Sequence, residues 1–173
     1  MKKLNFEIIK KFGTIKDGSF EIQLNYVSWN GESPKYEIRR WTNKGTKPLK
    51  GFAFSFSEMQ SIKKAIKCIK NDYSNCLIKK EIINNLFTCK IYDILEVLTE
   101  SEQWIRTISI VDWKFGVRFD MRAWSADYKN VGKGISITFS QAVELLNLLD
   151  NMKQSNDNEQ NFNNTDIESS LFI

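Results

Sequence analysis

The 173-residue chain contains no histidine and only three cysteines. The lack of histidine excludes catalytic triads and most general-base schemes. Cys68, Cys76 and Cys89 are odd in number and lack metal-ligand spacing, which predicts reduced thiols and no zinc site. Long apolar runs are missing too: none approaches the roughly 20 residues of a membrane span, and residues 1–13 lack a signal peptide's apolar run. We therefore expect a soluble intracellular protein, cytoplasmic or nucleoid-associated, that does not contact membranes.

Enzyme motifs are missing as well. The segment KGTKPLKG, residues 44–51, resembles a phosphate-binding loop only superficially, because it lacks the Gly-Lys-Ser/Thr ending and lies between expected strands. The acidic residues are scattered, and no carboxylate pair stands out as a metal or hydrolase site. The sequence thus predicts a protein that is not an enzyme and that uses no cofactor and no metal.

Negative charge is scarce in most of the chain. Residues 1–153 carry all 25 Lys and Arg against 17 acids, a net charge of +8, whereas residues 154–173 carry four acids and no base. A basic body favours polyanionic partners, although a solvated lysine-rich surface would have the same composition. The polar, asparagine-rich stretch from residue 154 onward predicts a disordered acidic tail.

The chain repeats itself. A shift of 83 residues aligns 35–57 with 118–140 and matches Arg39/Arg122, Trp41/Trp124, Lys50/Lys133, Gly51/Gly134, Phe56/Phe139 and Ser57/Ser140. Upstream, a shift of 84 matches Val27/Val111 and Trp29/Trp113. We infer a tandem duplication, with repeats at 1–72 and 88–153, a helical connector at 73–87 and the tail at 154–173.

Each repeat is expected to contain four strands and then a helix. In the first repeat, turn signals separate strands near 5–15, 19–29, 34–42 and 50–56. Ser57, with Gln60 three residues on, is expected to cap the first helix, and Ser140 the second. Each helix is the nearest cover for its own sheet. The predicted class is α+β: two tandem ββββα repeats, each a four-stranded antiparallel sheet plus helix, paired through their helices as an intrachain pseudo-dimer.

Basic and aromatic residues share one strand face in both repeats. Period-two alternation puts Lys35, Arg39 and Trp41 of KYEIRRW on one side, and RFDMRAW repeats the pattern with Arg118, Arg122 and Trp124. An exposed tryptophan can stack an unpaired base, worth about 1–3 kcal/mol, while Arg and Lys meet phosphates. Alternatively, the tryptophans are core residues and Arg39 pairs with Glu37. Arg40, which becomes Ala123, is expected at the rim of the opposite face.

These residues resemble the positive cofactor 4 family of transcriptional coactivators and its bacterial YdbC-like relatives. The matching text is YVSWNGESPKYEIRRW and KGFAFSFSEMQSI, then VDWKFGVRFDMRAW and VGKGISITFSQAVEL. The resemblance implies a curved four-stranded sheet followed by a helix, homodimers joined through the helices, and binding of single-stranded DNA with little sequence preference. This chain departs from the family in carrying two copies.

The resemblance also implies particular contacts with the nucleic acid. Trp113 and Lys114 stand where the family has an aromatic–lysine pair; Trp29 matches Trp113, but Asn30 replaces the lysine. With two further loop lysines, the predicted nucleic-acid-binding residues are Trp29, Lys35, Arg39, Trp41, Lys47, Lys50, Trp113, Lys114, Arg118, Arg122, Trp124, Lys129 and Lys133.

The leading hypothesis is non-enzymatic binding of single-stranded DNA in replication, repair or transcription. Two alternatives stay open: a protein that binds single-stranded RNA, and a protein-interaction scaffold for acidic partners. The last residues, TDIESSLFI, are similar to the tails with which bacterial and phage single-stranded-DNA-binding proteins recruit partner proteins. A terminus that only improves solubility is the favoured interpretation of this tail.

Overall fold

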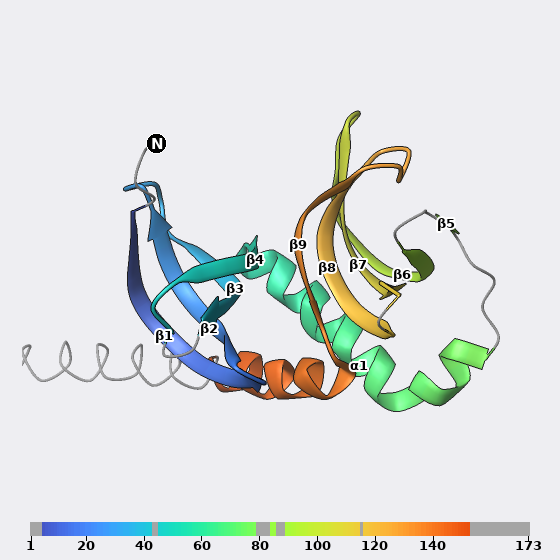
Figure 1. The fold of residues 1–173 in the computed structure, drawn as a ribbon, viewed down its shortest axis with the longest axis horizontal. Helices are drawn as coiled ribbons and strands as arrows, with labels where there is room; N and C mark the ends of the chain where they lie inside the picture. Colours follow the sequence, from blue (N-terminus) through green and yellow to red (C-terminus); the bar gives the residue numbers. More distant parts are fainter. Residues whose placement is uncertain (1–4, 43–44, 79–83, 86–88, 115, 153–173) are drawn as a thin grey trace, which may run out of the picture.

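The structure, a computed structural model, describes residues 5–42, 45–78, 84–85, 89–114 and 116–152. The first sheet contains β1 (Phe6–Asp17), β2 (Phe20–Trp29), β3 (Lys35–Thr42) and β4 (Pro48–Phe54), in that order and antiparallel. The second contains β6 (Lys90–Glu100), β7 (Trp104–Asp112), β8 (Val117–Ser125) and β9 (Val131–Ile137), with the two-residue β5 (Asn84–Asn85) added beside β6. Both sheets are open and strongly curved (Figure 1).

A helix follows each sheet: α1 (Phe56–Ile78) after β4, and a helix over residues 139–152 after β9. The predicted α+β class, with two four-stranded antiparallel sheets each followed by a helix, is therefore confirmed. Within the expected connector, residues 73–78 prolong α1 and Asn84–Asn85 form β5, while the remaining positions lie outside the described residues, as does the expected tail. No helix in the described part of the chain is long and apolar enough to cross a membrane.

The helix caps lie two residues earlier than predicted. Ser55 Oγ accepts a hydrogen bond from the Glu58 backbone N–H, and Glu58 Oε2 accepts one from the Ser55 backbone N–H at 2.7 Å. Thr138 and Gln141 make the same reciprocal pair at the second helix. Both repeats therefore begin their helix with a capping box, and Ser57 and Ser140 lie inside the helix. The prediction failed because serine at 57 followed by Gln60 has the same spacing signature.

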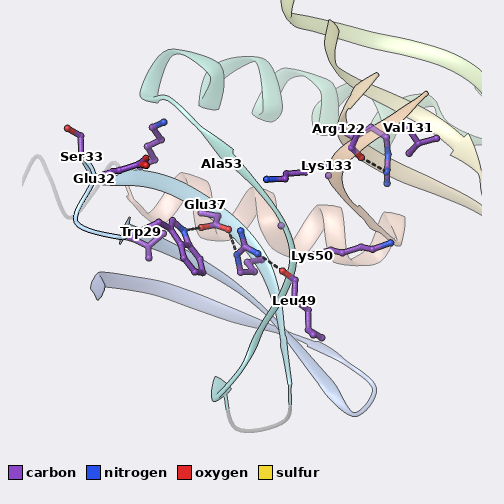
Figure 2. Close-up of a pocket in the computed structure, with 16 residues that line it drawn as sticks. Trp29, Glu32, Ser33, Glu37, Leu49, Lys50, Ala53, Arg122, Val131 and Lys133 are labelled. Carbon is purple, nitrogen blue, oxygen red and sulfur yellow. Dashed lines mark hydrogen bonds and ion pairs between the residues drawn. The ribbon is translucent and has the colours of Figure 1, made fainter. Parts of the chain in front are cut away.

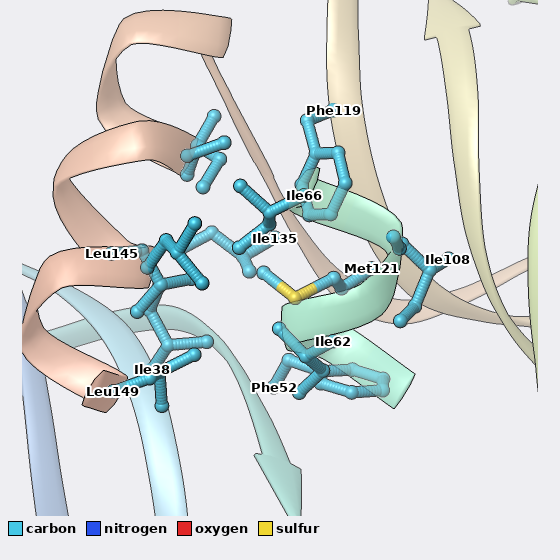
Figure 3. Close-up of a cluster of buried hydrophobic side chains, with 14 of the residues drawn as sticks. Ile38, Phe52, Ile62, Ile66, Ile108, Phe119, Met121, Ile135, Leu145 and Leu149 are labelled. Carbon is cyan, nitrogen blue, oxygen red and sulfur yellow. The ribbon is translucent and has the colours of Figure 1, made fainter. Parts of the chain in front are cut away.

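The two sheets share one hydrophobic core, and each helix reaches the sheet of the other repeat. Lys64 of α1 contacts Glu96 of β6 at 2.6 Å, whereas Gln141 of the second helix donates to the Lys16 carbonyl of β1 at 3.0 Å. Figure 3 shows Leu145 and Leu149 beside Ile38 of β3, and α1 residues between the sheets. The helices do not cover only their own sheets, because an apolar helix surface placed between two apolar sheet faces buries more area than one packed on a single sheet.

Two arginines each join one repeat to the fourth strand of the other. Arg40 of β3 pairs with Asp17 and donates to the Ser136 carbonyl of β9 at 3.3 Å. Arg106 of β7 pairs with Glu58 and donates to the Ala53 carbonyl of β4. Ala53 and Ser136 are 83 positions apart, so the two carbonyls are repeat equivalents. Arg40, expected at the rim, is half-buried at the contact between the repeats because its partner carbonyl lies there.

Candidate nucleic-acid interface

The face opposite the shared core carries the predicted binding residues of β3 and β8. On this face of β3 lie Glu37, Arg39 and Trp41, and the β8 equivalents are Asp120, Arg122 and Trp124. Neighbouring strands add polar side chains that are nevertheless buried, among them Asn25 and Ser109. The curvature of each sheet folds this face inward, so alternation places residues on it without exposing them.

In the second repeat, Asp120 holds Arg122 and Trp113 in one arrangement. Its carboxylate is completely buried and accepts hydrogen bonds from Arg122 Nη2 at 2.8 Å, from Trp113 Nε1 at 3.0 Å and from the Ser136 hydroxyl. The Arg122 guanidinium carbon lies 4.3 Å from the centroid of the Trp113 ring. The guanidinium is thus held by a bidentate interaction with one carboxylate and by contact with the face of an aromatic ring.

The first repeat contains the same arrangement. Glu37 accepts from Trp29 Nε1 at 2.6 Å and pairs with Arg39 Nε, and the Arg39 guanidinium carbon lies 4.6 Å from the Trp29 ring centroid. Arg39 Nη1 donates to the Leu49 carbonyl, as Arg122 Nη1 does to the equivalent Gly132 carbonyl. We call each Trp–acid–Arg set a clamp: Trp29–Glu37–Arg39 and Trp113–Asp120–Arg122. Arg39 is the more exposed arginine, at 22% of its side chain against 8%.

The repeated Lys-Gly pair has a structural reason in the clamps. Gly51 is the cross-strand neighbour of Arg39, and Gly134 is that of Arg122. A Cβ at Gly51 would lie 2.8 Å from Glu37 Oε1 and 2.9 Å from Arg39 Cβ, and one at Gly134 would overlap the Arg122 side chain. Glycine is therefore required for the arginine to lie flat across the fourth strand, and the preceding lysine alternates to the opposite side of that strand.

Trp41 and Trp124 differ from the prediction. They are 1% and 0% exposed, so the expectation that they form open stacking platforms is wrong. Phe6 packs against Trp41 with ring centroids 5.2 Å apart, and Trp113 stacks on Trp124 at 5.9 Å. Alternation correctly assigned the face, but Phe6 at the start of β1 covers Trp41, and Ile91 of β6 together with Trp113 packs against Trp124. Neither indole N–H has an acceptor among the described residues.

A groove crosses the junction of the two sheets. Its volume is ≈ 820 Å³, and it is lined by both repeats along β3, β4 and β9. Five cationic side chains line it against two acidic ones, Glu32 and Glu37: the cations are Lys35, Arg39, Lys50, Arg122 and Lys133. Figure 2 shows Lys50 of β4 extending toward the second sheet and Lys133 of β9 extending toward the first.

The lysines of the groove differ from its arginines in their partners. Lys35, Lys50 and Lys133 are exposed and have no acidic partner within the described residues. Both arginines have one in their clamp. The positive charge that is free to meet a ligand is therefore mainly that of the lysines, while the clamped arginines offer fixed planar edges.

Four further predicted residues lie outside the groove lining, three of them in turns and Arg118 in β8. Lys114 is exposed and has a left-handed φ of 69°, like its counterpart Asn30 at 53°. Arg118 is half-buried and donates to the Val117 carbonyl at 3.2 Å. Lys47 and Lys129 are exposed, and Lys129 Nζ lies 3.4 Å from Asp127. Three lysines and two arginines of the predicted set thus line one groove, whereas Lys47, Lys114, Arg118 and Lys129 lie outside its lining.

Sequence reasoning missed Glu37 and Asp120 as members of the site. Both are buried, at 1% and 0% exposure, and each orients an arginine and a tryptophan. The signal was present, since the two repeats keep an acid two residues before the arginine. It was interpreted as a surface pair because alternation alone does not show that the face is buried.

Comparison with known proteins does not assign the chain to a family. No family model matches the chain. A protein of Treponema pallidum (strain Nichols), described only as uncharacterized, is 26% identical over 70 residues, which is 39% of this chain and 82% of the relative. The matched length is close to that of one predicted repeat.

Proposed function

We propose that the protein binds single-stranded DNA without strong sequence preference and without catalysis. The observation that carries the proposal is the groove at the junction of the sheets, where unpaired Lys35, Lys50 and Lys133 lie beside two clamped arginines. A row of cations with few acids suits a chain of phosphates. Backbone-directed cations do not read bases, so little sequence preference is expected.

The duplication supports a covalent pseudo-dimer as the binding unit. Both repeats contribute to the groove: Lys50 and Lys133 are equivalent positions that cross it from opposite sides. Arg40 of β3 donates to a carbonyl of β9 and Arg106 of β7 donates to a carbonyl of β4, so each repeat is hydrogen-bonded to the fourth strand of the other. Joining the repeats in one chain makes their pairing independent of protein concentration.

Fluorescence anisotropy of a labelled oligo-dT at increasing salt tests this proposal. We expect saturable binding by the intact chain whose affinity falls linearly on a log–log plot against salt, with a slope near −0.7 for each phosphate contacted. Competitors are unlabelled single-stranded DNA, duplex DNA, single-stranded RNA and polyglutamate. Preferential displacement by single-stranded DNA supports the proposal, whereas stronger displacement by RNA or by polyglutamate would replace it with the corresponding alternative.

A further inference from the structure

Only one of the five tryptophans of the chain offers an open ring. All five lie within the described residues: Trp41 and Trp124 are buried, and Trp29 and Trp113 are half-buried with a guanidinium over each ring. Trp104, the first residue of β7, is 43% exposed. Trp104 is therefore the indole on which an unpaired base could stack. No sequence motif indicated this residue.

The first repeat has an aromatic residue at the equivalent place. Phe20, the first residue of β2, lies 84 positions before Trp104 and is 41% exposed. Their cross-strand partners, Thr42 and Ser125, are equivalent as well. Core packing does not account for two large aromatic rings held in water at matching positions, since removing apolar area from water is favourable.

Each exposed ring lies beside a loop that carries an exposed lysine. Thr42, opposite Phe20, donates its backbone N–H to the Lys47 carbonyl at 3.0 Å. Ser125, opposite Trp104, donates to the Asn130 carbonyl at 3.0 Å, next to Lys129. The Lys129–Asp127 pair is exposed and so holds the lysine only weakly. Aromatic face and cation thus occur together in both repeats, as they do on surfaces that bind single strands.

Trp104 also lies next to the groove. A Cβ added at Gly132 would lie 2.8 Å from Trp104 Cζ3, so the indole edge rests against β9 between Val131 and Lys133. Val131, Gly132 and Lys133 all line the groove, as does Leu49, the first-repeat counterpart of Gly132. A strand that leaves the groove past Lys133 therefore meets the Trp104 ring.

We infer that Trp104, with Phe20 in the first repeat, is the surface on which unpaired bases stack while the groove lysines hold the phosphates. The inference rests on the proposed function. It assigns recognition of the unpaired state to these rings, because bases in a duplex have no free faces for them.

Anisotropy titrations of the intact chain with a labelled oligo-dT test the inference. Trp104→Leu should weaken binding roughly 5- to 150-fold, the effect of losing one stacked base, and should leave the salt slope unchanged. Trp104→Phe should retain most of the affinity, and Phe20→Leu should weaken binding in the same direction. The control is Val97→Ala, which alters another exposed apolar residue, on β6, and should bind like wild type.

A purely structural role for Trp104 predicts a different pattern, so thermal unfolding is measured in parallel. If wild type binds and a folded Trp104→Leu binds equally well, the inference is overturned and the proposed function stands. If wild type itself does not bind, the proposed function fails. Should Trp104→Leu not fold, ultraviolet cross-linking of wild type to the oligonucleotide decides: an adduct at Trp104 supports the inference, and adducts only at other residues overturn it.

Discussion

Asp120→Asn probes the clamp of the second repeat most severely. The variant keeps the shape of the side chain but removes the charge that faces Arg122, a guanidinium with only 8% of its side chain exposed. Breaking a buried ion pair from one side costs about 3–5 kcal/mol, because the remaining charge stays desolvated without a partner. Asp120 also accepts from Trp113 and Ser136, so an amide in its place must turn its NH2 group toward at least one donor.

The equivalent change in the first repeat should be milder. In Glu37→Gln the stranded cation is Arg39, whose side chain is 22% exposed and can be partly hydrated. We expect a loss of about 1–3 kcal/mol there, the cost of an unsatisfied buried group. The control is Glu144→Gln, an exposed acid of the second helix, which should change the free energy of unfolding by less than about 0.5 kcal/mol.

Urea unfolding, followed by tryptophan fluorescence, measures all three variants. At about 2–4 °C per kcal/mol for a chain of this size, Asp120→Asn should also lower the melting temperature by about 6–20 °C. A loss for Asp120→Asn below that of Glu37→Gln, or within the range of Glu144→Gln, would refute the reasoning that burial of the clamp determines its energetic weight.

Three further perturbations follow from the fold. Gly134→Ala and Gly51→Ala should each lower the free energy of unfolding by about 1–3 kcal/mol in urea titrations, because the added methyl overlaps the clamp; wild-type stability would contradict this. In a double-mutant cycle, the losses of unfolding free energy caused by Arg40→Ala and Arg106→Ala should be nearly additive, since the two arginines share no partner; a large coupling energy would show that the two contacts are not independent. Residues 1–78 alone should give no folded monomer in size-exclusion chromatography and circular dichroism, because the second helix no longer covers β1 and β3; a stable monomer would disprove the shared core.

Much of the fold was predictable because its signals are local and occur twice. Turn residues bounded the strands, and the alternation in KYEIRRW and RFDMRAW assigned the side chains of β3 and β8 to the correct faces. Both helix caps were predicted two residues too late, because each helix start offers two hydroxyl residues, Ser55 and Ser57 or Thr138 and Ser140, and the choice depends on where the preceding strand ends. Which sheet each helix would contact could not be predicted, since both sheets present similar apolar faces.

The candidate site was predictable in its cations and not in its aromatic residues. Lys35, Lys50 and Lys133 are exposed at the groove as their positions in the pattern suggested. Trp41 and Trp124 were misjudged because burial on this face depends on curvature and on residues such as Phe6, which are distant in sequence. Phe20 and Trp104 escaped notice because they begin their strands, outside the matched motifs.

The salt dependence of oligo-dT binding in two matched double variants shows whether the groove holds the nucleic acid. Lys50→Ala/Lys133→Ala removes two groove lysines, and Lys67→Ala/Lys70→Ala removes two exposed lysines of α1 with the same change in net charge. We expect the groove pair to weaken binding and to reduce the log–log salt slope by about 1.4, and the helix pair to do neither. Equal effects of the two pairs would mean that net charge, and not the groove, attracts the nucleic acid, and would contradict the account.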